Sequence, residues 1–315
     1  NNVAVGDTAL DSIASGTSNN VAIGSGAGTG LTNGSNTTAI GYNALAANAS
    51  TNFNTAVGSG AMAAQNEGGR SVALGYNALT SDTKGARNTA IGWSSLANQN
   101  FTSVTTAYNT AVGYNAGVTV TTGVQNTLIG GLAGDALTVG YNNVALGYLA
   151  LSSDTAGNDN TAVGRGALGS QNFTSATDSL NTGIGYLAGT SVTTGVQNTL
   201  IGSLSGDALT TGNRNTALGY SALSSDTLGD RNVAIGNLAL QTQNFTTSTD
   251  SYNTAVGYNA GGVISTGVQN TLIGAQAGDA ITTGGYCTFI GMNAGGAATT
   301  GTLNAFLGRS SGSAV

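Results

Sequence analysis

One glycine recurs along the whole chain at the end of the motif Asn-Thr/Val-Ala-aliphatic-Gly. Of the seventeen intervals between successive copies, thirteen are 17 residues long, one is 18 and three are 21. A short period over the full length indicates stacked coils, none of which could bury a core alone. Residues 1–315 are therefore expected to form a single continuous repeat domain, an all-β parallel β-solenoid (β-roll) of about 18 coils, although this length would suggest two globular domains. These glycines, counted below as position 0 of each coil, are Gly6, Gly24, Gly41, Gly58, Gly75, Gly92, Gly113, Gly130, Gly147, Gly164, Gly185, Gly202, Gly219, Gly236, Gly257, Gly274, Gly291 and Gly308.

The three residues before each glycine alternate in character, which predicts a short strand. Position −1 is Val, Ile or Leu, and position −3 is Thr or Val except at Ala305. Position −2 is Ala in most coils, with Leu128, Leu200, Leu272, Phe289, Phe306 and Gly183 as departures. Positions −3 and −1 share one face of a strand and position −2 lies on the other. We expect the aliphatic column to point into the coil and the alanine column to form a smooth outer face.

A single thin roll buries few large side chains, so its stability is expected to depend on association. The expected outer alanine face, enlarged at the bulky departures, is the natural surface for this. Symmetry about the long axis would bury one face of every subunit, and this predicts a homo-oligomer, a trimeric rod above all.

Position −4 is Asn in fifteen of the eighteen coils, and Thr37, Ser71 and Cys287 replace it in the others. Stacked amides can each donate to one neighbour and accept from another, which predicts an asparagine ladder. Turn chemistry explains this column better than a binding surface does. Cys287 is then expected to be a small, partly buried thiol.

The 21-residue intervals recur every fourth coil, which defines a 72-residue super-repeat, as in residues 113–184 and 185–256. The extra residues are expected to form bulges at 97–108, 169–180 and 241–252. Each bulge contains Asn-Phe-Thr, and its phenylalanine could either contact an external ligand or pack against a neighbouring subunit or the core. These phenylalanines are Phe101, Phe173 and Phe245.

An aromatic residue follows the glycine in alternate coils, so the rings are expected about 9.6 Å apart. Such rings could stack on sugars of a host-surface glycan, or they could pack over the bend with the hydroxyl in water. The sequence leaves both readings open. The residues are Tyr42, Tyr76, Tyr114, Tyr148, Tyr186, Tyr220 and Tyr258, with Trp93 as an extra member.

The composition argues against several classes of function. Seven Lys and Arg against thirteen Asp and Glu, a net charge of −6, make nucleic acid an unlikely partner. No run of about 18 apolar residues exists, so membrane insertion is not expected. The chain has no His, the usual general base and metal ligand, and its recurrent aspartates lie too far apart for a glycosidase pair. We therefore expect no catalysis, no metal and no cofactor.

Three stretches carry a resemblance: Asn-Thr-Ala-Val-Gly-Tyr-Asn-Ala-Gly at 109–117, Asn-Thr-Ala-Leu-Gly-Tyr-Ser-Ala-Leu at 215–223 and Ser-Val-Ala-Leu-Gly-Tyr-Asn-Ala-Leu at 71–79. They resemble repeats of phage tail fibres and the head repeat of YadA-like trimeric autotransporter adhesins, whose coil is shorter. The resemblance implies a left-handed trimeric β-roll and a segment of a longer fibre. It also implies a tail-fibre shaft in the virion that contributes to host-surface attachment. The alternative is an adhesin on the bacterial outer surface that binds glycans or host proteins.

An ice-binding solenoid is a third hypothesis, because the threonine column could form a flat face. Two observations weaken it: the column is expected to point inward, and it is interrupted by Val3, Val21, Val72, Val144 and Val233.

Overall fold

The computed structural model describes residues 1–14, 16–47 and 50–313, and these form an all-β parallel β-solenoid of about 18 turns with no helix. The expected fold class is confirmed. The contacts within the chain define two compact units. Unit 1 comprises Asn1–Asn158 with Thr174–Thr177, and unit 2 comprises Asp159–Phe173 with Asp178–Val315. Each unit is described by itself below.

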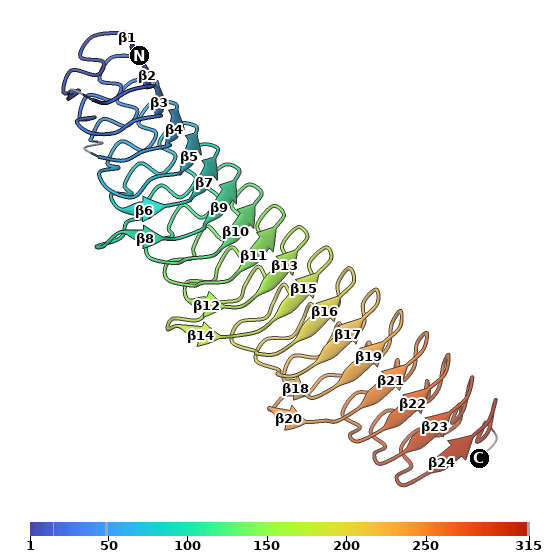
Figure 1. The fold of residues 1–315 in the computed structure, drawn as a ribbon. Coiled ribbons are helices and arrows are strands. Elements are labelled where there is room, and N and C mark those ends of the chain that lie inside the picture. Colours follow the sequence, from blue (N-terminus) through green and yellow to red (C-terminus); the bar gives the residue numbers. More distant parts are fainter. Residues whose placement is uncertain (15, 48–49, 314–315) are drawn as a thin grey trace. The chain divides into compact units, whose positions relative to one another are not determined.

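Each described coil contributes one three-residue strand to the parallel sheet of its unit, and Figure 1 draws these strands as arrows. In unit 1 these strands are β1 (Val3–Val5), β2 (Val21–Ile23), β3 (Thr38–Ile40), β4 (Thr55–Val57), β5 (Val72–Leu74), β7 (Thr89–Ile91), β9 (Thr110–Val112), β10 (Thr127–Ile129) and β11 (Val144–Leu146). In unit 2 they are β13 (Thr161–Val163), β15 (Thr182–Ile184), β16 (Thr199–Ile201), β17 (Thr216–Leu218), β19 (Val233–Ile235), β21 (Thr254–Val256), β22 (Thr271–Ile273), β23 (Thr288–Ile290) and β24 (Ala305–Leu307).

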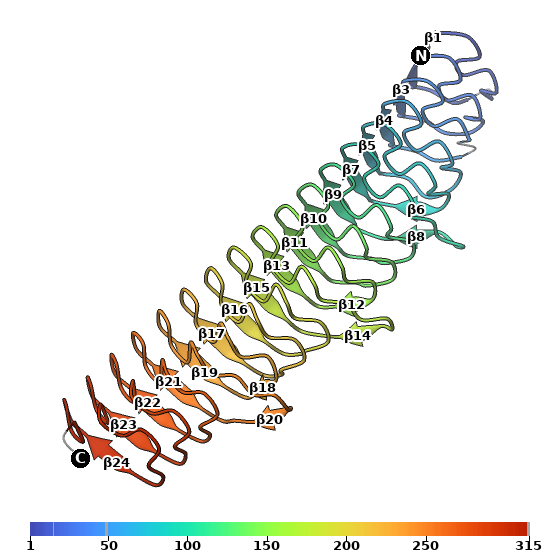
Figure 2. The ribbon, with the colours of Figure 1, turned by 180° about the vertical axis from the view of Figure 1, so that it is seen from behind.

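Six two-residue strands accompany the long intervals: β6 (Gly85–Ala86), β8 (Thr105–Thr106), β12 (Gly157–Asn158), β14 (Thr177–Asp178), β18 (Gly229–Asp230) and β20 (Thr249–Asp250). Within unit 1, β6 pairs with β8, and within unit 2, β18 pairs with β20. Figures 1 and 2 both draw these pairs away from the row of three-residue strands.

The register of the sheet aligns equivalent positions of successive coils. In unit 1, β3 and β4 pair Thr38 with Thr55 and Ala39 with Ala56. In unit 2, β16 and β17 pair Leu200 with Ala217 in the same way. Each position of the motif therefore forms a straight column within its unit, at the spacing of neighbouring strands, about 4.8 Å.

The expected orientation of the strand is wrong. Alanines at position −2, such as Ala56 and Ala217, are fully buried, while residues at −3 and −1 are half-buried or exposed. The bulky departures Leu128, Leu200, Leu272 and Phe289 are fully buried too. Alanine therefore points into the coil, and the Thr/Val and aliphatic columns form the outer face of the sheet.

The narrow interior explains this orientation, because it admits one large side chain at either of two facing positions. Nine of the eighteen coils place Ala at −2 and a buried Leu or Met at +4, such as Leu79. The coil of Leu128 has the reverse arrangement, with the large side chain at −2. Position +4 is then glycine both in this coil, at Gly134, and in the preceding coil, at Gly117. A Cβ on Gly134 would lie 2.8 Å from Leu128 Cδ2, and one on Gly117 would lie 2.6 Å from Leu128 Cδ1. The leucine thus fills the volume that +4 side chains occupy elsewhere.

Position 0 must be glycine for two reasons: its backbone has a positive φ, and the next coil lies too close for a side chain. Gly130 has a φ of 134°, and a Cβ there would lie 2.5 Å from the carbonyl oxygen of Gly147 in the next coil. This contact is far inside van der Waals distance, so no side chain fits at this position.

The three phenylalanines of the bulges are buried within their own chain, with exposed fractions of 5 to 8%. In unit 2, Phe245 lies two residues after Gln243. The side-chain amide of Gln243 donates to the buried carboxylate of Asp226. The rings are therefore not exposed to a ligand, and the prediction of Phe101, Phe173 and Phe245 as surface-binding residues is wrong.

Candidate functional surface

The outer sheet face, defined as the side chains at positions −3 and −1, exposes aliphatic side chains beside the threonines of position −3 in both units. Val72, Leu74, Val144 and Leu146 are exposed on it in unit 1, and Leu218 and Ile273 in unit 2. The expected self-association through the alanine face is therefore wrong, because that face is the core. The opposite face of the same strands is the surface available to a partner. The threonine column also faces outward, which removes one argument against ice binding, although the valine interruptions remain.

The aromatic column at position +1 lies beside this face and is exposed throughout. The seven tyrosines and Trp93 have exposed fractions of 45 to 61%. In unit 1, the rings of Tyr76 and Trp93 overlap with centroids 4.3 Å apart. A Cβ on Gly131 would lie 3.6 Å from Tyr148 Cδ2, so this ring leans over the preceding coil. The aromatic residues predicted as candidate ligand contacts are thus accessible, and the rings of Tyr76, Trp93 and Tyr148 also contact or approach a neighbouring coil.

A second exposed column at position −5 escaped the sequence analysis. It contains four of the seven basic residues, and three of these place Cζ over an aromatic ring of a neighbouring coil. The pairs are Arg70 with Phe53 at 5.8 Å, Arg87 with Tyr108 at 5.4 Å, and Arg231 with Tyr252 at 5.4 Å. The residue before each ladder position was the available signal, since it reads Phe, Arg, Arg, Tyr in four successive coils.

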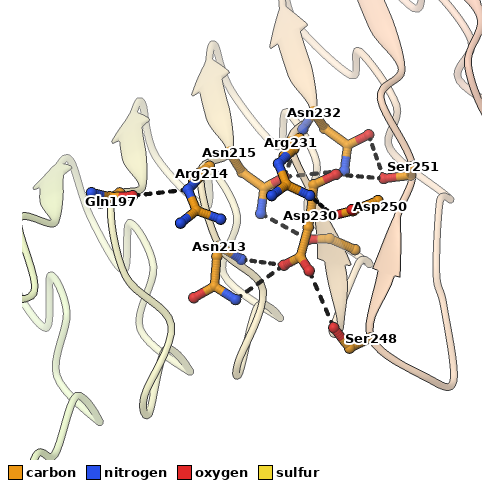
Figure 3. Close-up of polar contacts among 11 residues, drawn as sticks. Gln197, Asn213, Arg214, Asn215, Asp230, Arg231, Asn232, Ser248, Asp250 and Ser251 are labelled. Carbon is orange, nitrogen blue, oxygen red and sulfur yellow. Dashed lines mark hydrogen bonds and ion pairs between the residues drawn. The ribbon is translucent and has the colours of Figure 1, made fainter.

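The asparagine ladder is confirmed, but its bonds run mainly through the backbone. In unit 2, Asn215 Nδ2 donates to the carbonyl of Gly229, and Asn215 Oδ1 accepts from the backbone N–H of Asn232 at 2.9 Å. Figure 3 shows this part of the ladder beside the polar cluster of Asp230. The amides are buried, so they hold successive turns together and present nothing to a ligand.

Cys287 occupies a ladder position as expected. Its backbone N–H donates to Asn270 Oδ1, and its thiol donates to the carbonyls of Gly285 and Gly301. The thiol is buried, so it acts as a small core residue.

Aspartates in the 17-residue intervals that precede the long ones hold turns. Asp82, Asp154 and Asp226 each accept a hydrogen bond from the backbone N–H of the glycine three residues later, at 2.8 to 3.0 Å. Burial raises the pKa of the Asp82 and Asp226 carboxyls, against the opposing effect of hydrogen bonds from Gln99 and Gln243. Burial also raises the pKa of Asp135, Asp207 and Asp279.

Among the described residues, no three His, Cys, Asp or Glu side chains come together to hold a metal ion. The same part of the chain contains no helix capable of spanning a bilayer. A comparison with protein-family models finds no matching family, and a comparison with curated proteins finds no match. The functional argument therefore rests on the surfaces described above.

Proposed function

We propose that this chain is a structural fibre protein, a phage tail-fibre shaft in the virion that contributes to host-surface attachment. The observation that carries the proposal is the outer sheet face, on which every coil of a unit repeats in register one aliphatic residue and, in most coils, one threonine. A surface of this kind suits lateral association of identical chains, as a fibre requires.

We propose that three chains associate through the outer sheet face. Three residues of strand are about 10 Å wide and nine coils about 43 Å long, so the two units together offer roughly 860 Å². A stable interface buries about 800 Å² per partner, so the area of this face is of the size of one such interface, which a trimer would divide between two neighbours. The left-handed coil and the 72-residue super-repeat belong to the same proposal. They are supported by the resemblance to tail-fibre and adhesin repeats and by the recurrence of the 21-residue intervals.

The mass of the purified chain in solution and the labelling of native particles test the proposal. We expect a mass three times 30.6 kDa, and antibodies against the chain should label the tail fibres of phage particles in electron micrographs. A stable monomer at micromolar concentration would contradict the oligomer, and unlabelled phage particles would contradict the virion assignment.

The exposed aromatic column favours a second candidate, an adhesin on the bacterial outer surface. Aromatic faces bind sugars and protein side chains alike. Labelling of bacterial cells in place of phage particles would support it. In that case adhesion should fall when Tyr114, Tyr148 or Tyr258 is replaced by alanine. The buried Phe245 stays unchanged in these variants, so the fold is preserved.

A further inference from the structure

Four successive coils of unit 1 carry Phe53, Arg70, Arg87 and Tyr108 at position −5, and all four side chains are exposed. The strands of these coils, β4, β5, β7 and β9, pair directly with one another in register. Each of the four residues therefore lies one coil spacing, about 4.8 Å, from the next.

The two guanidinium groups turn away from each other. Arg70 Cζ lies over the ring of Phe53, in the preceding coil. Arg87 Cζ lies over the ring of Tyr108, in the following coil, and Nη1 donates to the tyrosine hydroxyl. Within the described residues, the ion pairs join Lys84 to Glu67 and Arg231 to Asp250, so neither Arg70 nor Arg87 is paired with a carboxylate. The space between them is bordered by two unneutralised cations.

A related arginine pair in unit 2 differs because one of its arginines is neutralised by a carboxylate. Arg214 and Arg231 occupy position −5 of two successive coils, and Tyr252 follows in the next. Arg214 Nε donates to Gln197, and Arg231 forms an ion pair with Asp250. Figure 3 shows Arg231 beside Asp250 and Arg214 beside Gln197, while the carboxylate of Asp230 accepts from Asn213 and Ser248.

The strand register shows what differs between the two places. In unit 2, β18 and β20 pair Asp230 with Asp250. In unit 1, β6 and β8 pair Ala86 with Thr106. Asp250, which forms the ion pair with Arg231 in unit 2, is therefore replaced beside Arg87 in unit 1 by Thr106. An anion from outside the chain can fill the role that Asp250 fills in unit 2.

We propose that Arg70 and Arg87 bind an anionic saccharide. The carboxylate or sulfate oxygens accept hydrogen bonds from the guanidinium groups, a geometry that suits arginine. The sugar ring contacts the exposed parts of Phe53 and Tyr108, which offer an apolar surface on either side of the charges. These flanking rings favour an anion attached to a sugar over a free inorganic ion. The site gives the attachment role proposed above a ligand class, but its binding is measurable on the purified chain alone.

Isothermal titration calorimetry of the native protein tests the site with 3′-sialyllactose, a heparin-derived hexasaccharide, lactose and sodium sulfate. We expect one site per chain for at least one of the two anionic saccharides, and the stronger ligand identifies the preferred anionic group. Lactose should not bind, and added NaCl should weaken binding because the charges are exposed.

Variants locate the site. Arg70→Gln and Arg87→Gln should each weaken binding about tenfold or more, since each removes a charge-assisted contact. Thr106→Asp should do the same, because it supplies beside Arg87 the carboxylate that Asp250 supplies beside Arg231. Arg214→Gln is the matched control and should leave the affinity unchanged. Asp250→Thr should raise the stoichiometry from one site to two.

The proposal is overturned if neither anionic saccharide binds, if lactose or sulfate binds as tightly as they do, or if Arg87→Gln leaves the affinity unchanged. Thermal unfolding of every variant confirms that the fold is intact. Light scattering on the same samples reports the oligomer, so failure of the binding site and failure of the fibre proposal are separate results.

Discussion

At the scale of single residues, the distance to the next coil decides which side chains are tolerated. Gly130 and Gly131 are neighbours in sequence with opposite requirements. A Cβ on Gly130 meets the backbone of Gly147 at 2.5 Å, whereas a Cβ on Gly131 meets only the ring of Tyr148 at 3.6 Å. The first glycine belongs to the repeat and the second does not, so sequence alone distinguishes them correctly.

Gly130→Ala should destabilise the protein by about 3 kcal/mol or more, because it combines a backbone clash with a φ that alanine rarely adopts. Gly131→Ala should change the stability by no more than about 0.5 kcal/mol. Urea unfolding followed by circular dichroism measures both. Equal effects of the two substitutions would mean that the close approach of successive coils is not as described.

The buried aspartates make the stability depend on pH. The pKa of Asp82 and Asp226 is higher in the folded chain than in the unfolded chain, where it is about 3.9. Their stabilising contribution is therefore complete below the unfolded value and is lost as the pH rises through the folded value. The urea midpoint should rise as the pH falls from 7 towards 4. The double variant Asp82→Asn/Asp226→Asn should show a shallower rise, and parallel curves for the two proteins would contradict the assignment.

At the scale of the coil, volume rather than hydrophobicity decides which way the strand faces. Alternation in the sequence identifies two faces but does not say which is inside. Leu128 and Leu200 at position −2 coincide with glycine at +4, in Gly134 and Gly206. This exchange of large and small residues between positions −2 and +4 indicates that the side chain at −2 points into the coil. A comparison of residue sizes at the two positions would have predicted it.

Leu128→Ala should cost about 2–5 kcal/mol, as expected for a cavity left by a fully buried leucine. Gly134→Leu in the same chain should recover part of the loss, because it recreates the common pair of alanine and leucine. The φ of 55° at Gly134 is close to the 51° of Leu79 at the equivalent position, so the backbone accepts the change. A double-mutant cycle by urea unfolding measures the coupling. An additive result, with Gly134→Leu harmful in both backgrounds, would rule out the exchange.

At the scale of the whole molecule, the repeat arranges exposed side chains in columns. Each column adds the exposed area of one position over many coils. The outer sheet face exposes aliphatic side chains beside threonines, and the aromatic and arginine columns lie at positions +1 and −5 on either side of it along the chain. An oligomer that buries the outer sheet face leaves these flanking columns at its rim, where they can meet a ligand.

Val144→Asp should weaken the proposed oligomer without unfolding the chain, because it places a charge on the outer sheet face. Val139→Asp is the matched control, since Val139 is a similarly exposed valine outside that face. Analytical ultracentrifugation should show a fall in mass for the first variant only. An unchanged mass for Val144→Asp would mean that the chains associate through another surface or not at all.

The period of the glycines by itself determined that the chain is a parallel β-solenoid, that its asparagines stack, and where the long intervals fall. These features are local or repeat from coil to coil, so a pattern along one dimension contains them. Only the tertiary structure decided which face of the strand is the core and that Phe101, Phe173 and Phe245 are buried. It also decided that Arg87 lacks the carboxylate that Arg231 has. These outcomes depend on how side chains from different parts of a coil share one narrow interior or meet across neighbouring coils, and spacing along the chain does not encode that competition for volume and charge.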